Sequence, residues 1–364
     1  MPRQSKTITL WQIVNDDLAS LQSDLRQAET ITAKAKVFAG ICIKALVTLI
    51  FCILFVVAFM GVLGKENAIV GVVVLLSVLT FQKVDFGYSS AQGAAALFGI
   101  FILFAFVPPL AAVIGGITAA LIMMLALLVL LIVACDRVEY QNHIVLVLSF
   151  LLLYGYPVTT IEGYKARVAG LLIGGVWAAS ILYRKNRHKQ STRSLLDVIK
   201  DFDPRKKDAE WKLKLAVLVP AAMLCGELLG LERPMWIGIA AMSVLSPFEH
   251  LRPLKMFERL LGSLLGAVLF YGLTLIPGVT PTLVGLSGGF LVGLTTSYKY
   301  QTIFNSLGAL SVAMLLMGPH ESILARIQDN AFAIIFVIVA VFVLDMVTDY
   351  LQKHFSTAEP ESIR

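Results

Sequence analysis

The sequence predicts an all-α polytopic membrane protein with about twelve transmembrane helices, arranged as two parallel six-helix repeats. Three observations lead to this prediction: the composition, a succession of long apolar runs, and a short similarity between the two halves of the chain. Of the 364 residues, 58% are apolar and 15% are charged, against roughly 45–50% and 25% in soluble domains. Because a spanning helix uses roughly 20 apolar residues, the chain can supply about ten to twelve such helices.

The first element is an N-terminal arm, residues 1–36, which is polar and carries no apolar core of the kind that marks a secretory signal. Between Leu10 and Ala35, apolar residues recur at helical spacing: Trp11, Val14, Leu18, Leu21, Leu25 and Ala28. This pattern predicts an amphipathic helix that lies on the cytoplasmic surface or packs under the bundle. A helix that binds a partner protein is the alternative.

The predicted spanning helices come next, in two groups separated by a polar linker. The first repeat, residues 37–183, holds apolar runs at 37–62, 68–81, 91–107, 110–135, 144–158 and 168–183. The linker, residues 184–212, is rich in charge and holds one short amphipathic piece near Leu195–Ile199. The second repeat, residues 213–350, holds runs at 213–230, 235–247, 260–276, 283–296, 303–318 and 327–347, and a tail follows at 351–364.

The basic residues indicate how these helices are oriented. With the N-terminus in the cytoplasm, 24 of the 30 basic residues fall in cytoplasmic segments and 5 in outer loops, while Lys44 lies inside the first helix. Basic residues are enriched on the cytoplasmic side of membrane proteins. We therefore expect a multi-pass protein of the inner (plasma) membrane with both termini and the linker in the cytoplasm.

The two halves share short sequence similarities in corresponding positions. Ser77-Val78-Leu79 aligns with Ser243-Val244-Leu245, and Ala166-Arg167-Val168 with Ala325-Arg326-Ile327. Because six is an even number, each half begins and ends on the same side of the membrane. The halves are therefore predicted to be parallel repeats related by an axis along the membrane normal.

The second helix of each repeat is predicted to be too short to cross a bilayer. The runs 68–81 and 235–247 hold 14 and 13 residues, about 21 and 20 Å of helix against a hydrocarbon core of about 30 Å. Paired short segments point to a transporter's binding site, since broken helices aim free backbone groups into a cavity. Polar residues follow each run, Gln82-Lys83-Val84-Asp85 and Phe248-Glu249-His250-Leu251-Arg252-Pro253, and ordinary cytoplasmic loops are the alternative interpretation.

Charged residues inside apolar runs are costly and are therefore candidates for function. Lys44 could pair with an anionic substrate, or its ammonium could reach the cytoplasmic headgroups. Glu227 could carry a proton if burial raises its pKa, or could pair with Arg233 or Arg326 at the outer face. Asp345 and Asp349 are interpreted as interfacial.

Other motifs point to packing and exclude several kinds of chemistry. Glycines four residues apart, as in Gly285, Gly289 and Gly293, let helices approach closely. The four cysteines lie in or beside apolar runs, with no disulfide or metal spacing. No phosphate-binding loop and no catalytic arrangement is found, so we expect no enzyme activity, no cofactor, no metal and no nucleic-acid partner.

The second repeat contains Trp236, then Ser243-Val244-Leu245-Ser246-Pro247, then Arg259-Leu260-Leu261-Gly262 and Gly266. This order resembles the fusaric acid resistance and aromatic acid exporter family of inner-membrane proteins, which has the plant aluminium-activated malate transporters as distant relatives. Arg167, Gly170 and Gly174 repeat the spacing in the first repeat, whereas Ala91-Gln92-Gly93 lacks the Arg. Two six-helix units with a cytoplasmic segment between them also resemble that family's layout, although the linker here is shorter than in larger members.

The resemblance implies proton-driven export of aromatic or other amphipathic carboxylates. The carboxylate would be held by basic side chains and the apolar body covered by aromatic ones, with lipid and a small organic anion as partners of a monomer or small homo-oligomer. An anion channel and a membrane scaffold for envelope machinery are the alternatives. The expected substrate-binding residues are Lys44, Phe81, Gln82, Lys83, Asp85, Trp236, Phe248, His250, Arg252 and Arg259, with Glu227 for proton coupling and Arg167, Gly170, Gly174, Gly262, Gly266 and Arg326 for helix packing.

Overall fold

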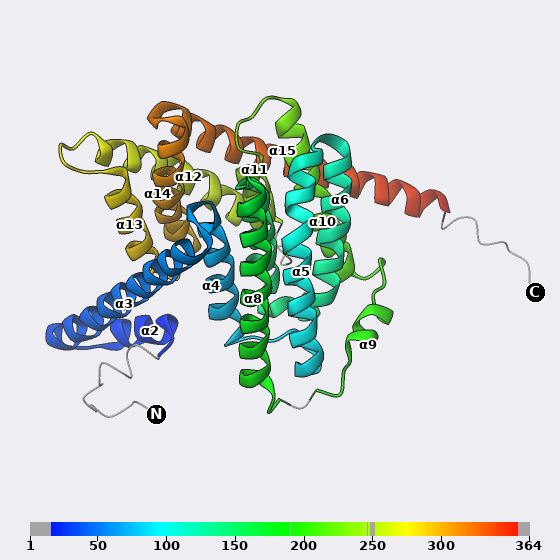
Figure 1. Cartoon of the computed structure of the whole chain (residues 1–364). Helices are drawn as coiled ribbons and strands as arrows, with labels where there is room; N and C mark the ends of the chain where they lie inside the picture. Colours follow the sequence, from blue (N-terminus) through cyan, green and yellow to red (C-terminus); the bar gives the residue numbers. More distant parts are fainter. Residues whose placement is uncertain (1–15, 190, 246, 248–251, 356–364) are drawn as a thin grey trace, which may run out of the picture. The chain divides into compact units, whose positions relative to one another are not determined.

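The computed structural model describes residues 16–189, 191–245, 247 and 252–355, and within these ranges it contains helices and no strand (Figure 1). The helices are α2 (Leu18–Gln27), α3 (Ile31–Leu63), α4 (Ala68–Phe81), α5 (Ser90–Ile114), α6 (Gly116–Ala134), α7 (Asn142–Gly155), α8 (Ile161–Asn186), α9 (Leu195–Lys200), α10 (Lys207–Leu228), α11 (Pro234–Val244), α12 (Arg252–Thr274), α13 (Pro281–Val292), α14 (Tyr298–Met317) and α15 (Pro319–Phe355), with short 3-10 turns at Lys65–Asn67 and Val138–Tyr140. The all-α prediction is therefore confirmed for the described part.

A helix lies over each apolar run that the sequence analysis singled out, but the helices differ in length. Six helices of the described ranges are long and apolar enough to cross a membrane: α3, α5, α6, α8, α12 and α15. These helices show a multi-pass membrane protein. A total of twelve spans, and the two repeats, stay predictions.

The two short helices are confirmed, and two further helices are short as well. α4 holds 14 residues and α11 holds 11, so they are about 21 and 17 Å long. Yet α7 and α13, with 14 and 12 residues, are equally short. Shortness therefore does not single out the second helix of each predicted repeat.

The boundary between the third and fourth runs is wrong in the sequence analysis. Pro108 and Pro109 were expected to separate two helices, but both lie inside α5. The chain turns instead at Gly115 and Gly116, which have φ of 66° and 59°. Glycine adopts these left-handed conformations without steric cost, and prolines are tolerated within membrane helices.

The chain forms two compact units, each built from two stretches of sequence. Unit 1 comprises Met1–Leu75 and Leu254–Ile327, and unit 2 comprises Leu76–Pro253 and Gln328–Arg364. These units cut across the predicted repeats 37–183 and 213–350, because residues from both repeats contribute to each. The two repeats are a relation between two parts of the sequence, and this relation stays a prediction.

In unit 1, the N-terminal helix α2 is fixed to the turn between α13 and α14. The Gln22 side chain donates to the Leu294 carbonyl (2.9 Å) and accepts from the Thr296 hydroxyl (2.6 Å), and Leu21 is buried. The predicted arm thus packs on the bundle through residues 18–27, whereas 31–36 already belong to α3. Trp11 and Val14 lie outside the described residues.

Glycines bring α12 and α14 together in unit 1. A Cβ built on Gly262 would lie 2.7 Å from Thr302 Cβ, and one on Gly266 would lie 2.6 Å from the Ile303 carbonyl oxygen. The adjoining core is formed by Ala267, Phe270, Val284, Leu307 and Leu310. The Gly262 and Gly266 spacing therefore serves helix packing here.

In unit 2, α5 packs along α8, α6 along α10, and α7 along α11. Close glycine contacts mark two of these pairs, Gly175 against Phe101 and Gly155 against Met235. α11 is almost entirely enclosed, with Trp236, Ile237 and Ala241 at 3% exposure or less. The short helix α11 is thus a core element of unit 2.

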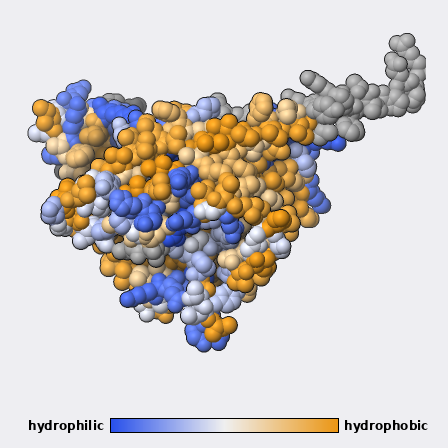
Figure 2. All heavy atoms as spheres, turned by 90° about the horizontal axis from the view of Figure 1, so that it is seen from above, coloured by the Kyte–Doolittle hydropathy of each residue, from blue (hydrophilic) through white to orange (hydrophobic). Residues whose placement is uncertain are grey.

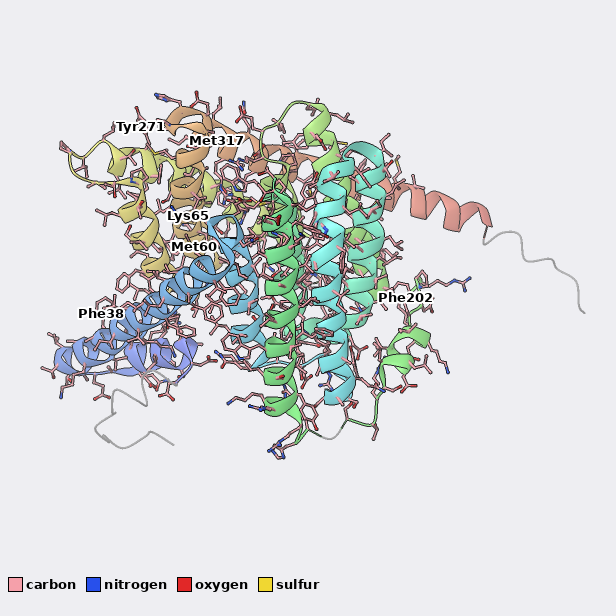
Figure 3. The ribbon with its side chains drawn as sticks, viewed as in Figure 1. Phe38, Met60, Lys65, Phe202, Tyr271 and Met317 are labelled. Atoms are coloured by element: carbon pink, nitrogen blue, oxygen red, sulfur yellow. The ribbon has the colours of Figure 1, made fainter. Side chains whose placement is uncertain are left out.

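Large apolar side chains cover much of the outer surface (Figure 2). The helix α3 is the extreme case: its most apolar stretch has no buried residue, and Phe38 near its start is 52% exposed (Figure 3). Such a surface fits a hydrocarbon environment, since soluble proteins rarely expose large apolar patches.

We predict that Gly266→Val destabilises the protein by about 1–3 kcal/mol, because the new side chain meets the α14 backbone. Thermal unfolding in detergent, followed by circular dichroism, measures the effect. Gly272→Ala is the matched control on the same helix, since a Cβ there meets nothing within 4 Å. Equal melting temperatures for the two variants would contradict the packing role.

Candidate functional site

One face of unit 2, which we call the linker face, gathers the ends of several helices together with residues 187–189 and 191–206. Hydrogen bonds connect these segments: the Ser89 amide donates to the Arg193 carbonyl (3.0 Å), the Ser90 hydroxyl to the Asn186 carbonyl (2.8 Å) and the Leu195 amide to Gln92 Oε1 (2.7 Å). The C-terminal ends of α4, α6, α8 and α11 and the N-terminal ends of α5, α7 and α10 lie at this face. Most of the predicted cytoplasmic loops of unit 2 therefore meet in one place.

Four of the predicted substrate-binding residues lie at the end of α4 and in the loop after it, and they differ in burial. Phe81 is fully buried and packs edge-on against Phe86, with ring centroids 5.3 Å apart. Gln82 and Lys83 are exposed. The Asp85 carboxylate is nearly buried, accepts from the Gly87 amide (2.8 Å) and pairs with Lys189 of the linker at 2.8 Å.

Two side chains from neighbouring helices donate hydrogen bonds to backbone carbonyls near the C-terminal ends of α4, α6 and α11. The Asn142 amide, at the start of α7, donates to the carbonyls of Asp85 (2.9 Å) and Ala134 (3.0 Å). The Trp211 indole, on α10, donates to the carbonyl of Leu245, the C-cap of α11 (2.7 Å). The sequence analysis expected backbone groups at the two short helices to be available to a solute, but the carbonyls of Asp85, after α4, and Leu245, after α11, are paired inside the protein.

Residues 191–206, which we call the strap, are held on the linker face by one ion pair of Arg193, and a second ion pair of Arg193 lies within the strap. Arg193 Nη2 lies 3.1 Å from Asp136 Oδ1, after α6, and 3.0 Å from Asp201 Oδ2, after α9. Within α9, Ser194 and Asp197 form a capping box, and the Ser194 hydrogen bonds lower the pKa of Asp197. Sequence reasoning missed Arg193 and Asp136, whose only signal was the charge of the linker and of the Asp136-Arg137 turn.

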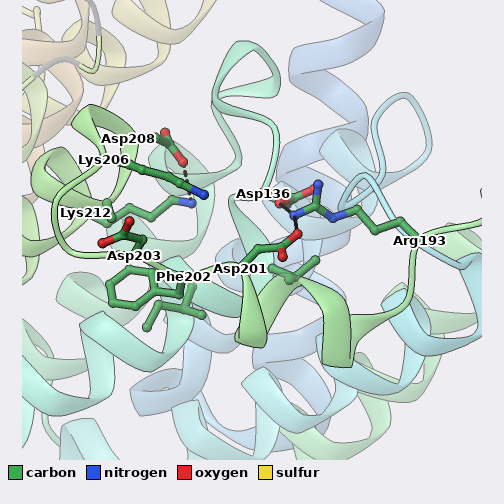
Figure 4. Close-up of a pocket in the computed structure, with 11 residues that line it drawn as sticks. Asp136, Arg193, Asp201, Phe202, Asp203, Lys206, Asp208 and Lys212 are labelled. Carbon is green, nitrogen blue, oxygen red and sulfur yellow. Dashed lines mark hydrogen bonds and ion pairs between the residues drawn. The ribbon is translucent and has the colours of Figure 1, made fainter.

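A cavity of about 200 Å³ lies between the strap and the ends of α6 and α10. Figure 4 shows its charged side chains in two groups, with Arg193, Asp136 and Asp201 in one and Lys206, Lys212, Asp203 and Asp208 in the other. The Lys212 ammonium is nearly buried and lies 2.8 Å from Asp208 Oδ2. The apolar part of the lining comes from Ile132, Val198, Phe202 and Ala209.

Two neutral groups beside this cavity stay protonated at physiological pH. Burial is the main reason why the pKa of the Cys135 thiol rises to about 12, with Lys212 opposing the rise. Burial also raises the pKa of Tyr88, and the Asp136 charge adds to it, while the Tyr88 hydroxyl donates to the Val133 carbonyl (3.0 Å). A protonated thiol is a poor nucleophile, so Cys135 has a packing role.

The remaining predicted substrate residues are dispersed. In unit 1, Lys44 donates to the Asp16 backbone carbonyl, and Arg259 on α12 is nearly buried. In unit 2, Trp236 lies in the core of α11. Phe248 and His250 lie outside the described residues, as does the side chain of Arg252. Binding by these residues stays a prediction.

The burial of Glu227 differs from the expectation. This residue lies near the end of α10 and is exposed, so the burial that the sequence analysis assumed for it is wrong. The reason is its position in the last turn of the helix, where the chain leaves the packed core at Leu228–Gly230. Its role in proton coupling stays a prediction.

The predicted packing residues of the first repeat lie at a close helix pair. Gly170 and Gly174 are buried in α8. Arg167 is fully buried, and its Nη1 donates to the Tyr156 carbonyl at the end of α7 (2.7 Å). Arg326, the corresponding residue in α15, is also nearly buried. Arg167 thus ties the α7–α8 turn together.

The described residues contain no group of histidine, cysteine and acidic side chains that could hold a metal ion. What the linker face offers is a small amphipathic cavity with charged walls.

We predict that Trp211→Phe destabilises the protein by about 1–3 kcal/mol, because the buried Leu245 carbonyl loses its donor. Thermal unfolding in detergent measures the change. Tyr183→Phe, at a half-exposed position of α8, is the control and leaves the melting temperature nearly unchanged. A Trp211→Phe protein that melts with the wild type would show that the bond carries no stability.

The comparisons with known proteins agree with the sequence resemblance. No curated protein and no solved structure matches the chain significantly. Residues 221–340 match a family model described as fusaric acid resistance protein-like. This stretch runs from α10 to α15 and includes α11 and the Arg259-Gly262-Gly266 motif. The predicted resemblance is thus confirmed over these residues: residues 221–340 of this chain are similar to the fusaric acid resistance protein-like family.

Proposed function

We propose that the protein is a secondary transporter of the bacterial inner membrane that exports small organic anions, such as aromatic carboxylates, with protons as the coupling ion. The match of residues 221–340 to the fusaric acid resistance protein-like family is the observation that carries this proposal. The six candidate spans support it, because export across a bilayer needs a polytopic protein. Both termini and the linker lie in the cytoplasm, as the distribution of basic residues favours.

Basic residues supply the anion selectivity in this proposal. Arg259 is the strongest candidate, because it lies in the matched segment and is nearly buried on α12. A guanidinium with little solvent around it attracts a carboxylate more strongly than an exposed one. Aromatic or apolar side chains cover the substrate's ring.

The test is uptake of radiolabelled benzoate into proteoliposomes under an imposed pH gradient. We expect flux that depends on the gradient and falls at least about tenfold in Arg259→Gln, as expected when a charge-assisted pair is removed. Lys299→Gln, a charge removal at the start of α14, is the control and keeps the flux.

Two outcomes would contradict the proposal. Current that follows voltage alone, with no effect of the pH gradient or of Glu227→Gln, identifies an anion channel. No benzoate flux in any condition, with cellular function lost only when the arm and linker are deleted, identifies a membrane scaffold.

A further inference from the structure

The cavity under the strap has the size of a site for one small ring. Its volume of about 200 Å³ is below the roughly 300–1,000 Å³ of pockets for drug-sized ligands. Its roof is the strap, which supplies Arg193, Val198, Asp201 and Phe202, and its floor is formed by the ends of α6 and α10. A ligand here would therefore contact both the bundle and the strap.

Not all hydrogen-bond donors of Arg193 are used. Both of its ion pairs, to Asp136 and Asp201, run to the same atom, Nη2. Its Nε is buried and has no hydrogen-bond partner among the described residues. A buried donor without an acceptor is unfavourable and needs an explanation, such as a ligand.

A free carboxylate can satisfy both atoms of this edge. Nε and Nη2 form one edge of the planar guanidinium group, and a carboxylate binds such an edge through two parallel hydrogen bonds. Asp201 is the partner that a ligand can replace, because its side chain is 58% exposed whereas that of Asp136 is 14% exposed. Replacement would release the end of α9 from Arg193.

The remaining walls combine an apolar surface with charges of both signs. Ile132, Val198 and Phe202 supply an apolar surface beside the charged groups. Asp208 is neutralised by Lys212, and Asp203 Oδ1 accepts from the Arg205 amide (3.0 Å). Lys206 lines the same cavity and adds an exposed positive charge.

We infer that this cavity binds a small aromatic carboxylate, whose carboxyl group replaces that of Asp201 on Arg193 and so breaks the ion pair between the residues that flank α9. The inference rests on the proposed function for the chemical class of the ligand only. The cavity is then a site for the exported anion at the linker face, apart from any site within the membrane.

The test uses the full-length protein in lipid nanodiscs and calorimetric titration with benzoate, benzamide and inorganic phosphate. We expect benzoate to bind and benzamide not to bind. Arg193→Gln should weaken benzoate binding about tenfold or more. Asp201→Asn should tighten it about three- to tenfold, because the competing carboxylate is gone. A purely structural Arg193 predicts no gain in the second variant.

Two matched controls separate the site from general charge effects. Lys200→Gln removes a positive charge from α9, and Glu139→Gln removes a negative charge from the α6–α7 turn; both residues are exposed and neither lines the cavity. Both variants should bind benzoate like the wild type. Amide hydrogen exchange gives an independent readout: benzoate should speed exchange at Asp201, at the end of α9, because this residue loses its ion pair with Arg193.

The results distinguish this inference from the proposed function. Equal binding of benzoate and benzamide, tighter binding of phosphate, or unchanged benzoate binding in Arg193→Gln would overturn the inference. Benzoate binding that follows the expected pattern without any benzoate transport would overturn the proposed function alone. Benzoate transport without binding at this cavity would overturn the inference alone.

Discussion

The structure of unit 2 depends on one constraint: a backbone carbonyl that ends a helix among apolar side chains needs a hydrogen-bond donor, because hydrocarbon supplies none. The Leu245 carbonyl receives the Trp211 indole, and the carbonyls of Asp85 and Ala134 share the Asn142 amide. Each donor comes from a neighbouring helix, α10 or α7. The bonds therefore fix where these helices end relative to one another and create the linker face.

The same constraint limits where a solute can find polar groups. At the linker face, the three carbonyls that the short helices and α6 offer are used by the protein itself. These three carbonyls are therefore not available to a solute unless the bonds break. Shortness of a helix is thus insufficient as a sign of a binding site, since α7 and α13 are short as well.

The sequence predicted elements well where one strong signal dominated. Long apolar runs predicted the helices, and α4 has the bounds that its run indicated. Predictions failed where two local rules competed. Proline and glycine both interrupt helices in general, but in α5 the prolines continue the helix and Gly115–Gly116 make the turn, since only glycine reaches positive φ cheaply.

The site residues were harder to predict because side-chain burial depends on tertiary contacts. Glu227 was expected to be buried because its neighbours are apolar, but it ends a helix and is exposed. Arg193 was hidden among many linker charges, and only the fold brings it to Asp136, 57 residues earlier in the chain. No periodicity in the sequence encodes such a pairing.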